Sequence, residues 1–160
     1  MNKNLSSTWK FVISILLCEI IGISSGLFSA GAIQTWYMTL QKPSWNPPNY
    51  LFGPVWTILY VLMGISLWLI WKSNASEPLQ KKAIYLFALQ LFINFWWSIV
   101  FFNFQSPALG LIVIILMLLS ILRTIFQFAP ISKTAAWLLV PYISWVSCAT
   151  ILNYTIWSLN

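Results

Sequence analysis

Aromatic and amide side chains recur at helical spacing inside long apolar stretches of this sequence. Residues three or four positions apart lie on one face of a helix. Three such sets are present: Trp56 with Tyr60, Asn94 with Trp97 and Phe101, and Trp145 with Ala149, which follow Tyr142. Tryptophan and tyrosine rings bind flat apolar molecules by stacking, and a few polar groups orient the ligand. These residue types predict an aromatic-lined cavity of low polarity.

The residues that carry most acid–base and metal chemistry are nearly absent. The chain has no histidine, and Glu19 and Glu77 are its two acidic residues. Cys18 and Cys148 stand in separate apolar stretches without C-x-x-C spacing, and we expect both to be small buried apolar side chains. The inventory predicts no metal site, no obligatory cofactor and no acid–base active site, and it leaves other enzymatic activity open.

Apolar residues make up 60% of the 160-residue chain and charged residues only 6%, against about 25% in a soluble domain. So few charges cannot cover a surface exposed to water, and the surface is therefore expected to face lipid. The net charge of +6 comes from scattered cations, which form no stripe that would follow a nucleic-acid backbone. The composition predicts an integral membrane protein whose partner is the lipid bilayer, with no nucleic acid bound.

Five apolar stretches are long enough to cross about 30 Å of hydrocarbon as α-helices. We expect them at residues 9–32, 50–71, 83–104, 107–128 and 135–159. The sequence therefore predicts a single all-α domain, 1–160, built as a five-transmembrane-helix bundle with a long loop at 33–49. A cleavable signal peptide is the alternative for the first stretch, but its length and the Glu19 in its middle favour a membrane span.

The cations of the connecting segments predict the orientation of the bundle. With five spans, the N-terminus and the second and fourth loops lie on one side. That side would hold Lys3, Lys10, Lys72, Lys81, Lys82, Arg123 and Lys133, whereas Lys42 stands alone on the other. Cytoplasmic loops are enriched in lysine and arginine. We therefore expect a multi-pass protein of the cell membrane with a cytoplasmic N-terminus, and with loop 33–49 and the C-terminus outside.

Polar side chains inside the predicted spans are expected to face the bundle interior. An unpaired amide is costly in hydrocarbon, so Asn94 and Asn153 should either join helices by hydrogen bonds or line a cavity. Glu19 is the one ionisable group near the middle of a span, and Arg123 or interior hydroxyls are its expected partners. The alternative is a protonated or snorkelling carboxyl group with a local structural role. Gly22 and Gly26, four residues apart, permit close helix packing.

Four segments carry dense patterns of aromatic, proline and amide residues. They are WYMTLQKPSWNPP at 36–48, FGPVWTILY at 52–60, QLFINFWWSIVFF at 90–102 and PYISWVSCATILN at 141–153. Together they resemble bacterial members of the tryptophan-rich sensory protein/translocator protein family (TspO/MBR), which includes the peripheral-type benzodiazepine receptor. The resemblance covers nearly the whole chain and is weakest in the first and fourth spans.

The resemblance implies a five-helix bundle, often a homodimer, with a ligand pocket near one membrane face that the first loop closes as a lid. Family members bind tetrapyrroles such as protoporphyrin IX and haem, and isoquinoline-carboxamide and benzodiazepine compounds. Bacterial members are also linked to light-dependent porphyrin breakdown, which implies photo-oxidative roles for Trp56 and Trp145. With the helix faces above, the expected ligand-binding residues are Tyr37, Lys42, Pro43, Trp45, Pro47, Pro48, Trp56, Tyr60, Asn94, Trp97, Phe101, Tyr142, Trp145 and Ala149.

Two functions are compatible with these residues. The first is a membrane receptor or sensor that binds porphyrins and drug-like aromatic ligands and promotes porphyrin oxidation in light. The second is a transporter of porphyrins or other amphiphiles, for which the chain offers neither inverted repeats nor a relay of charged residues. Specific cholesterol handling is not expected, because no lysine or arginine follows Tyr154 as the animal motif requires.

Overall fold

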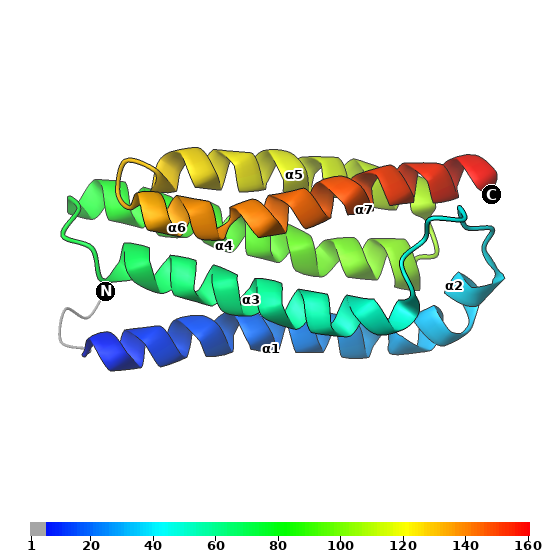
Figure 1. Ribbon diagram of the computed structural model, residues 1–160, viewed down its shortest axis with the longest axis horizontal. Helices are drawn as coiled ribbons and strands as arrows, with labels where there is room; N and C mark the ends of the chain where they lie inside the picture. The colour runs from blue at the N-terminus through cyan, green and yellow to red at the C-terminus, as the bar shows by residue number, and fades with distance from the viewer. Residues whose placement is uncertain (1–5) are drawn as a thin grey trace.

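The computed structural model describes residues 6–160, so Lys3, one of the cations used above for orientation, lies outside the described residues. The five long helices are α1 (Ser7–Gln34), α3 (Asn49–Trp71), α4 (Glu77–Ser98), α5 (Pro107–Phe128) and α7 (Val140–Leu159). The short segments are α2 (Trp36–Thr39), the π-helical turn η1 (Ile99–Asn103) and α6 (Lys133–Leu138). All the long helices run along the long axis of an elongated bundle (Figure 1).

The helical segments confirm the predicted fold class. Residues 6–160 contain no β-strand. Five segments are long and apolar enough to cross a membrane. One of them consists of α4 continued by η1, and another consists of α6 continued by α7. The described chain is therefore an all-α bundle of five candidate membrane spans, as the apolar stretches predict.

The turn between η1 and α5 shows how local sequence ends one span and starts the next. Gln105 adopts a left-handed backbone conformation, with φ of 52°, which reverses the chain within a few residues. The Ser106 hydroxyl then accepts a hydrogen bond from the Leu109 amide at 3.3 Å and caps the start of α5. Pro107 occupies the first turn, where its missing N–H leaves no bond unmade.

The fourth and fifth expected spans differ in how closely sequence pattern and helix coincide. The helix α5 occupies residues 107–128, whereas the span expected at 135–159 is divided into α6 and α7, with Leu139 in a turn between them. Pro141 lies in the first turn of α7 and has no N–H to donate to the preceding turn. The proline therefore interrupts the helix without ending the membrane span.

The α1 and α3 helices touch at two glycines. A Cβ atom added at Gly64 of α3 would lie 2.6 Å from the Cα of Ile15 in α1, which is closer than real contacts allow. A Cβ at Gly22 of α1 would overlap the ring of Tyr60 in α3. Small residues let helix backbones approach closely, and this packing holds α1 against the rest of the bundle.

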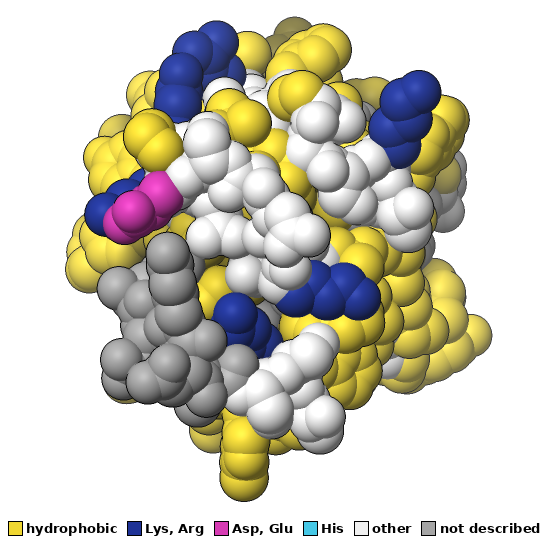
Figure 2. Space-filling view, turned by 90° about the vertical axis from the view of Figure 1, so that its left-hand side faces the viewer, with side chains coloured by type: hydrophobic (Ala, Val, Ile, Leu, Met, Phe, Trp, Pro, Cys, Tyr) yellow, Lys and Arg dark blue, Asp and Glu magenta, His cyan; other side chains and the backbone are white. Residues whose placement is uncertain are grey.

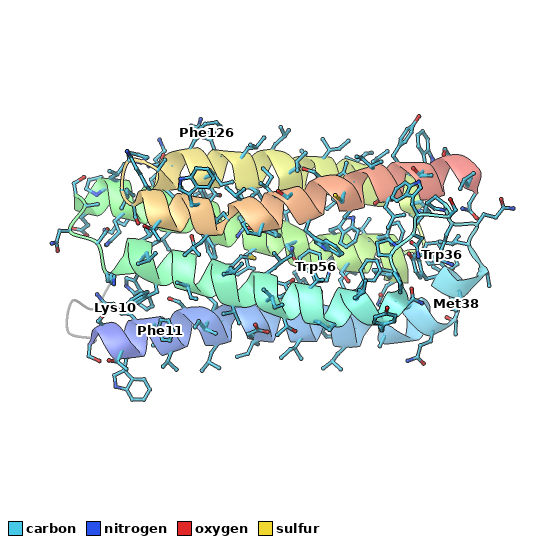
Figure 3. All side chains as sticks on the ribbon, viewed as in Figure 1. Lys10, Phe11, Trp36, Met38, Trp56 and Phe126 are labelled. Atoms are coloured by element: carbon cyan, nitrogen blue, oxygen red, sulfur yellow. The ribbon has the colours of Figure 1, made fainter. Side chains whose placement is uncertain are left out.

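The outer surface of the bundle is as apolar as its interior. Met63 and Ile114 are fully buried, yet Leu27 and Phe126 are more than 70% exposed. Figure 3 shows the Phe126 ring pointing away from the helices. An apolar side chain loses nothing by facing lipid, so this surface suits a protein embedded in a bilayer.

Charged side chains gather at the end of the bundle that holds the start of α1 and the α3–α4 and α5–α6 connections (Figure 2). Lys72 at the end of α3 lies 3.5 Å from the centroid of the Trp68 ring, and Lys81 forms an exposed ion pair of 2.7 Å with Glu77 in the first turn of α4. This first turn extends α4 beyond the apolar stretch expected at 83–104, because a helix can continue past the hydrocarbon. Lys42 lies at the other end, in the loop after α2.

We predict that Gly64→Ala lowers the stability of the bundle by about 1–3 kcal/mol, because the new methyl group forces the α1 and α3 backbones apart. The measurement is the thermal unfolding midpoint in a mild detergent. Gly31→Ala is the control, since a Cβ at Gly31 meets nothing within 4 Å and alanine favours the helix. An equal midpoint for the two variants would contradict the role of Gly64.

Candidate ligand-binding site

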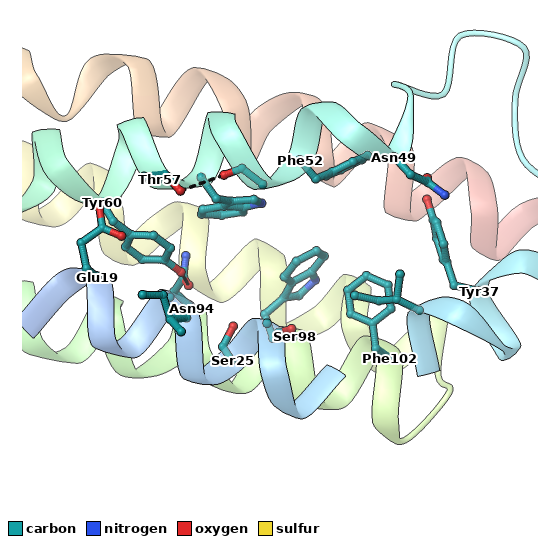
Figure 4. Close-up of a pocket in the computed structure, with 17 residues that line it drawn as sticks. Glu19, Ser25, Tyr37, Asn49, Phe52, Thr57, Tyr60, Asn94, Ser98 and Phe102 are labelled. Atoms are coloured by element: carbon teal, nitrogen blue, oxygen red, sulfur yellow. Dashed lines mark hydrogen bonds between the residues drawn. The ribbon is translucent and has the colours of Figure 1, made fainter. Parts of the chain in front are cut away.

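A cavity of about 420 Å³ lies between α1, α3 and α4, within the size range of small-molecule pockets. Figure 4 shows Glu19 and Tyr60 at one end of it and Tyr37 and Phe102 at the other. Most of the wall is aromatic or aliphatic. The residues that line it are Glu19, Gly22, Ile23, Ser25, Gly26, Ile33, Tyr37, Asn49, Phe52, Gly53, Trp56, Thr57, Tyr60, Asn94, Trp97, Ser98 and Phe102.

Asn94 joins three helices at the inner end of this cavity. The Tyr60 hydroxyl of α3 donates to Asn94 Oδ1 at 2.6 Å, and Asn94 Nδ2 donates to the Tyr142 hydroxyl of α7 at 2.9 Å. All three side chains are buried. The expectation that Asn94 faces the interior is therefore confirmed. The sequence left two roles open for this amide, joining helices by hydrogen bonds or lining a cavity, and Asn94 does both.

The rings of the wall are packed against each other. Trp56 stacks on Tyr60 at 5.6 Å between centroids with 29° between planes, and it meets Tyr142 edge-on at 6.2 Å. On α4, the Trp97 indole N–H donates to Asn153 Oδ1 of α7 at 3.3 Å. Such contacts restrict the rotamers of both indoles, so a ligand would meet a wall whose orientation is already set.

The π-helical turn η1 positions the rings beside Trp97. Its wider hydrogen bonding, with the Phe104 amide donating to Ile99 O at 3.1 Å, shifts the side chains that follow α4. Phe101 stacks on Trp97 at 5.6 Å and is buried, whereas Phe102 lies on the cavity wall. The face expected to contain Asn94, Trp97 and Phe101 therefore lines the cavity with Phe102 in place of Phe101.

The loop after α2 packs against Tyr37 at the other end of the cavity, although none of residues 40–48 lines it. The Tyr37 hydroxyl donates to Asn46 Oδ1 at 3.2 Å, and the Lys42 ammonium lies 4.6 Å from the centroid of the Tyr37 ring. Burial raises the pKa of the Tyr37 phenol above its ordinary value, so the hydroxyl remains a donor at neutral pH. The Asn160 side chain bonds both to the Gln41 amide at 2.9 Å and to its carbonyl at 3.0 Å.

A second cavity of about 460 Å³ lies between this loop and α7. The Trp145 and Phe52 rings meet edge-on at 5.9 Å, and Phe52 lines both cavities. Cys148 also lines the second cavity and is exposed, so the expectation that it is buried is wrong. An apolar sequence context does not indicate burial where the surroundings are lipid. The second cavity is lined by Trp45, Pro47, Phe52, Trp145, Cys148, Ala149, Ile151 and Leu152.

The structure divides the residues expected at the site into four places. The first cavity takes Tyr37, Trp56, Tyr60, Asn94 and Trp97. The second takes Trp45, Pro47, Trp145 and Ala149. Phe101 and Tyr142 are buried behind the wall. Lys42, Pro43 and Pro48 belong to the loop and line neither cavity.

Several residues of the cavity wall are not among those predicted from the sequence. Phe52 and Gly53 precede Trp56 and Thr57 by four residues and share their face of α3, so helical spacing contained a signal for both. Ser98, whose hydroxyl lies 2.8 Å from that of Ser29, follows Asn94 by four residues, so the same spacing contained a signal for it. Within residues 6–160, no group of three His, Cys, Asp or Glu side chains is placed to hold a metal ion.

Five membrane-crossing helices with an internal aromatic cavity define a helical multi-pass membrane protein. The chain belongs to the TspO/MBR family, whose family model matches residues 14–158. It is 43% identical to the tryptophan-rich protein TspO of Chlorobaculum tepidum, over 100% of this chain and 99% of that protein. It is 34% identical to the translocator protein of Homo sapiens, over 95% and 91% respectively. The resemblance of the four segments is thereby confirmed.

We predict that Asn94→Leu destabilises the bundle by about 3 kcal/mol, because it leaves the buried hydroxyls of Tyr60 and Tyr142 without partners. Adding Tyr60→Phe and Tyr142→Phe removes those hydroxyls and should recover much of the loss. Thermal unfolding in detergent measures both effects. Asn103→Leu is the matched amide control, since the exposed Asn103 loses one hydrogen bond, to the Phe28 carbonyl at 2.9 Å, and leaves no buried hydroxyl without a partner. A triple variant no more stable than Asn94→Leu would contradict this account.

Proposed function

We propose that this protein is a membrane receptor or sensor that binds tetrapyrroles and other flat aromatic ligands in the cavity between α1, α3 and α4. Membership of the TspO/MBR family supports a membrane sensor or translocator role in general. The cations gathered at one end of the bundle support an orientation with that end in the cytoplasm and the loop after α2 outside.

The aromatic wall of the cavity is the observation that carries this proposal. Phe52, Trp56 and Trp97 present rings to a space that contains little polar surface apart from Asn94, Glu19 and a few hydroxyls. Ring stacking adds about 0.5–1.5 kcal/mol per pair to the burial of apolar area. A planar macrocycle gains from several such contacts at once, whereas a flexible chain does not.

The lid end of the cavity suits the acidic groups of a porphyrin. Lys42 lies against Tyr37, which lines the cavity, so its ammonium stands near the entrance rather than among the apolar walls. A propionate at that entrance would meet a cation and still contact water. The chain contains no histidine to ligate haem iron, so recognition depends on the shape and the acid groups of the macrocycle.

We predict that protoporphyrin IX and haem bind with similar affinity, measured by saturable quenching of tryptophan fluorescence in detergent or nanodiscs. Gly26→Leu should weaken both by about tenfold, because Gly26 lines the cavity and a Cβ there meets nothing within 4 Å, so the new side chain occupies ligand space. Gly31→Leu is the matched control, since Gly31 meets open space and does not line the cavity. Binding of haem a hundredfold tighter than protoporphyrin, or unchanged affinity in Gly26→Leu, would contradict the proposal.

Light-dependent oxidation of a bound porphyrin is the second part of this proposal. An excited porphyrin takes one electron from a neighbouring indole, and dioxygen accepts that electron from the reduced porphyrin to become superoxide. The indole radical cation then regains its electron from the porphyrin, and superoxide adds to the resulting porphyrin radical cation, so that the net change is addition of one dioxygen to the macrocycle. The step needs no acid–base residue. Trp56 lines the cavity, and Trp145 lies behind Phe52 on the neighbouring one, so Trp56 is the nearer donor.

We predict that Trp56→Phe and Trp145→Phe bind protoporphyrin but bleach it more slowly under illumination, with the larger loss, about tenfold, in Trp56→Phe. The measurement is the decay of porphyrin absorbance in aerobic samples at equal occupancy. Trp157→Phe is the control, because Trp157 is 48% exposed and lines neither cavity. Bleaching at the control rate in both cavity variants would exclude a role for these indoles.

A further inference from the structure

Glu19 places a carboxyl group at the inner end of the cavity, in the middle of α1. It lies beside Tyr60, at the opposite end from Tyr37 (Figure 4). One of its oxygens, Oε1, is buried and has no hydrogen-bond partner among the described residues. The expected pairing with an arginine or an interior hydroxyl is wrong, since no ion pair joins Glu19 to Arg123 in residues 6–160 and no hydroxyl bonds to it.

The hydroxyls nearest to this carboxyl in the cavity wall are already used. Tyr60 donates its hydroxyl proton to Asn94 at 2.6 Å, and Thr57 donates to the Gly53 carbonyl at 3.0 Å. No lysine or arginine belongs to the described wall. A buried acceptor without a donor is costly, and the carboxyl group that carries it belongs to a residue of the cavity wall.

We propose that Glu19 is the anchor for the amino group of a cationic aromatic amphiphile whose apolar part lies between α1 and α3. This inference rests on the proposed function in that it uses the same cavity. An amine and a carboxyl group form the same ion pair whichever of them brings the proton, and charge-assisted hydrogen bonds are the strongest a carboxylate accepts. A cation far from water needs such a counter-charge.

The dimensions of the cavity suit a ligand with one charged end. Its wall includes α1 residues from Glu19 to Ile33, which at 1.5 Å per residue span about 21 Å. Gly26 and Gly53 line this length, and a Cβ at either would meet nothing within 4 Å. A rigid aromatic group can therefore lie along the glycines with its amine at Glu19.

The test uses two probes that differ only in the polar group, 9-(aminomethyl)anthracene and 9-anthracenemethanol. Their dissociation constants are measured by tryptophan quenching in an uncharged detergent, and the ratio of the two constants is compared among variants, so that partition into the micelle cancels. The wild-type protein should prefer the amine by about tenfold. Glu19→Gln, which keeps the size of the side chain, should bring the ratio close to one.

Glu77→Gln is the matched control. It removes the same charge from the other acidic residue, which forms an exposed ion pair with Lys81 and does not line the cavity, and it should keep the wild-type preference. If Glu19→Gln does not fold, Glu19→Asp withdraws the carboxyl by one methylene and should reduce the preference several-fold. A wild-type ratio of one, or an unchanged ratio in the Glu19 variant, would overturn the inference.

Protoporphyrin IX is titrated in parallel to separate this inference from the proposed function. Saturable porphyrin binding with an amine preference that does not depend on Glu19 overturns the anchor and leaves the receptor proposal standing. A preference for the amine that depends on Glu19, without porphyrin binding, supports the anchor and overturns the tetrapyrrole proposal. If neither aromatic probe nor porphyrin binds saturably, both fail.

Discussion

The cavity depends on the hydrogen bonds of one amide buried in the middle of the bundle. In hydrocarbon a polar group cannot form hydrogen bonds with water, so the position of Asn94 is fixed by the protein groups that bond both its oxygen and its nitrogen. It takes the Tyr60 proton from α3 and gives one to Tyr142 of α7. Tyr60 in turn supports the stacked Trp56 and fills the space above Gly22. The position of one wall and the approach of α1 thus follow from the same two bonds.

Lipid as the outer solvent explains both what the sequence predicts and what it hides. The five spans and the inward amides are predictable, because length sets the crossing and an unpaired amide is costly. Which apolar residues lie in the core and which on the surface is not predictable, since apolar residues are favourable on both sides of the helix. The sequence pattern therefore predicts one site for Phe101 and Trp145, whereas the first is buried in the core and the second lines a separate cavity.

Two interruptions of helical geometry are also beyond periodicity alone. Pro141 predicts an interruption of the helix. Tertiary packing determines that the helical conformation resumes at once as α7 within the same membrane span. The π-helical turn η1 has no proline or glycine to mark it. It nonetheless decides which of two adjacent rings, Phe101 or Phe102, reaches the cavity. The π-helical turn shifts the register of the side chains that follow it, so the 3.6-residue repeat of an α-helix does not predict which of them lines the cavity.

The two ends of the cavity have opposite electrostatic character, and this constrains any ligand that fills it. Lys42 stands over Tyr37 at the lid, and Glu19 stands at the inner end with an oxygen that nothing satisfies. A tetrapyrrole with two propionates has one acceptable direction, with its acids at the lid and its apolar edge towards the carboxyl. That edge offers no donor to the Glu19 carboxyl group, whereas an amine would offer one. On the two proposals above, the two ligand classes would differ in what they meet at the inner end of the cavity and would compete for the aromatic wall between.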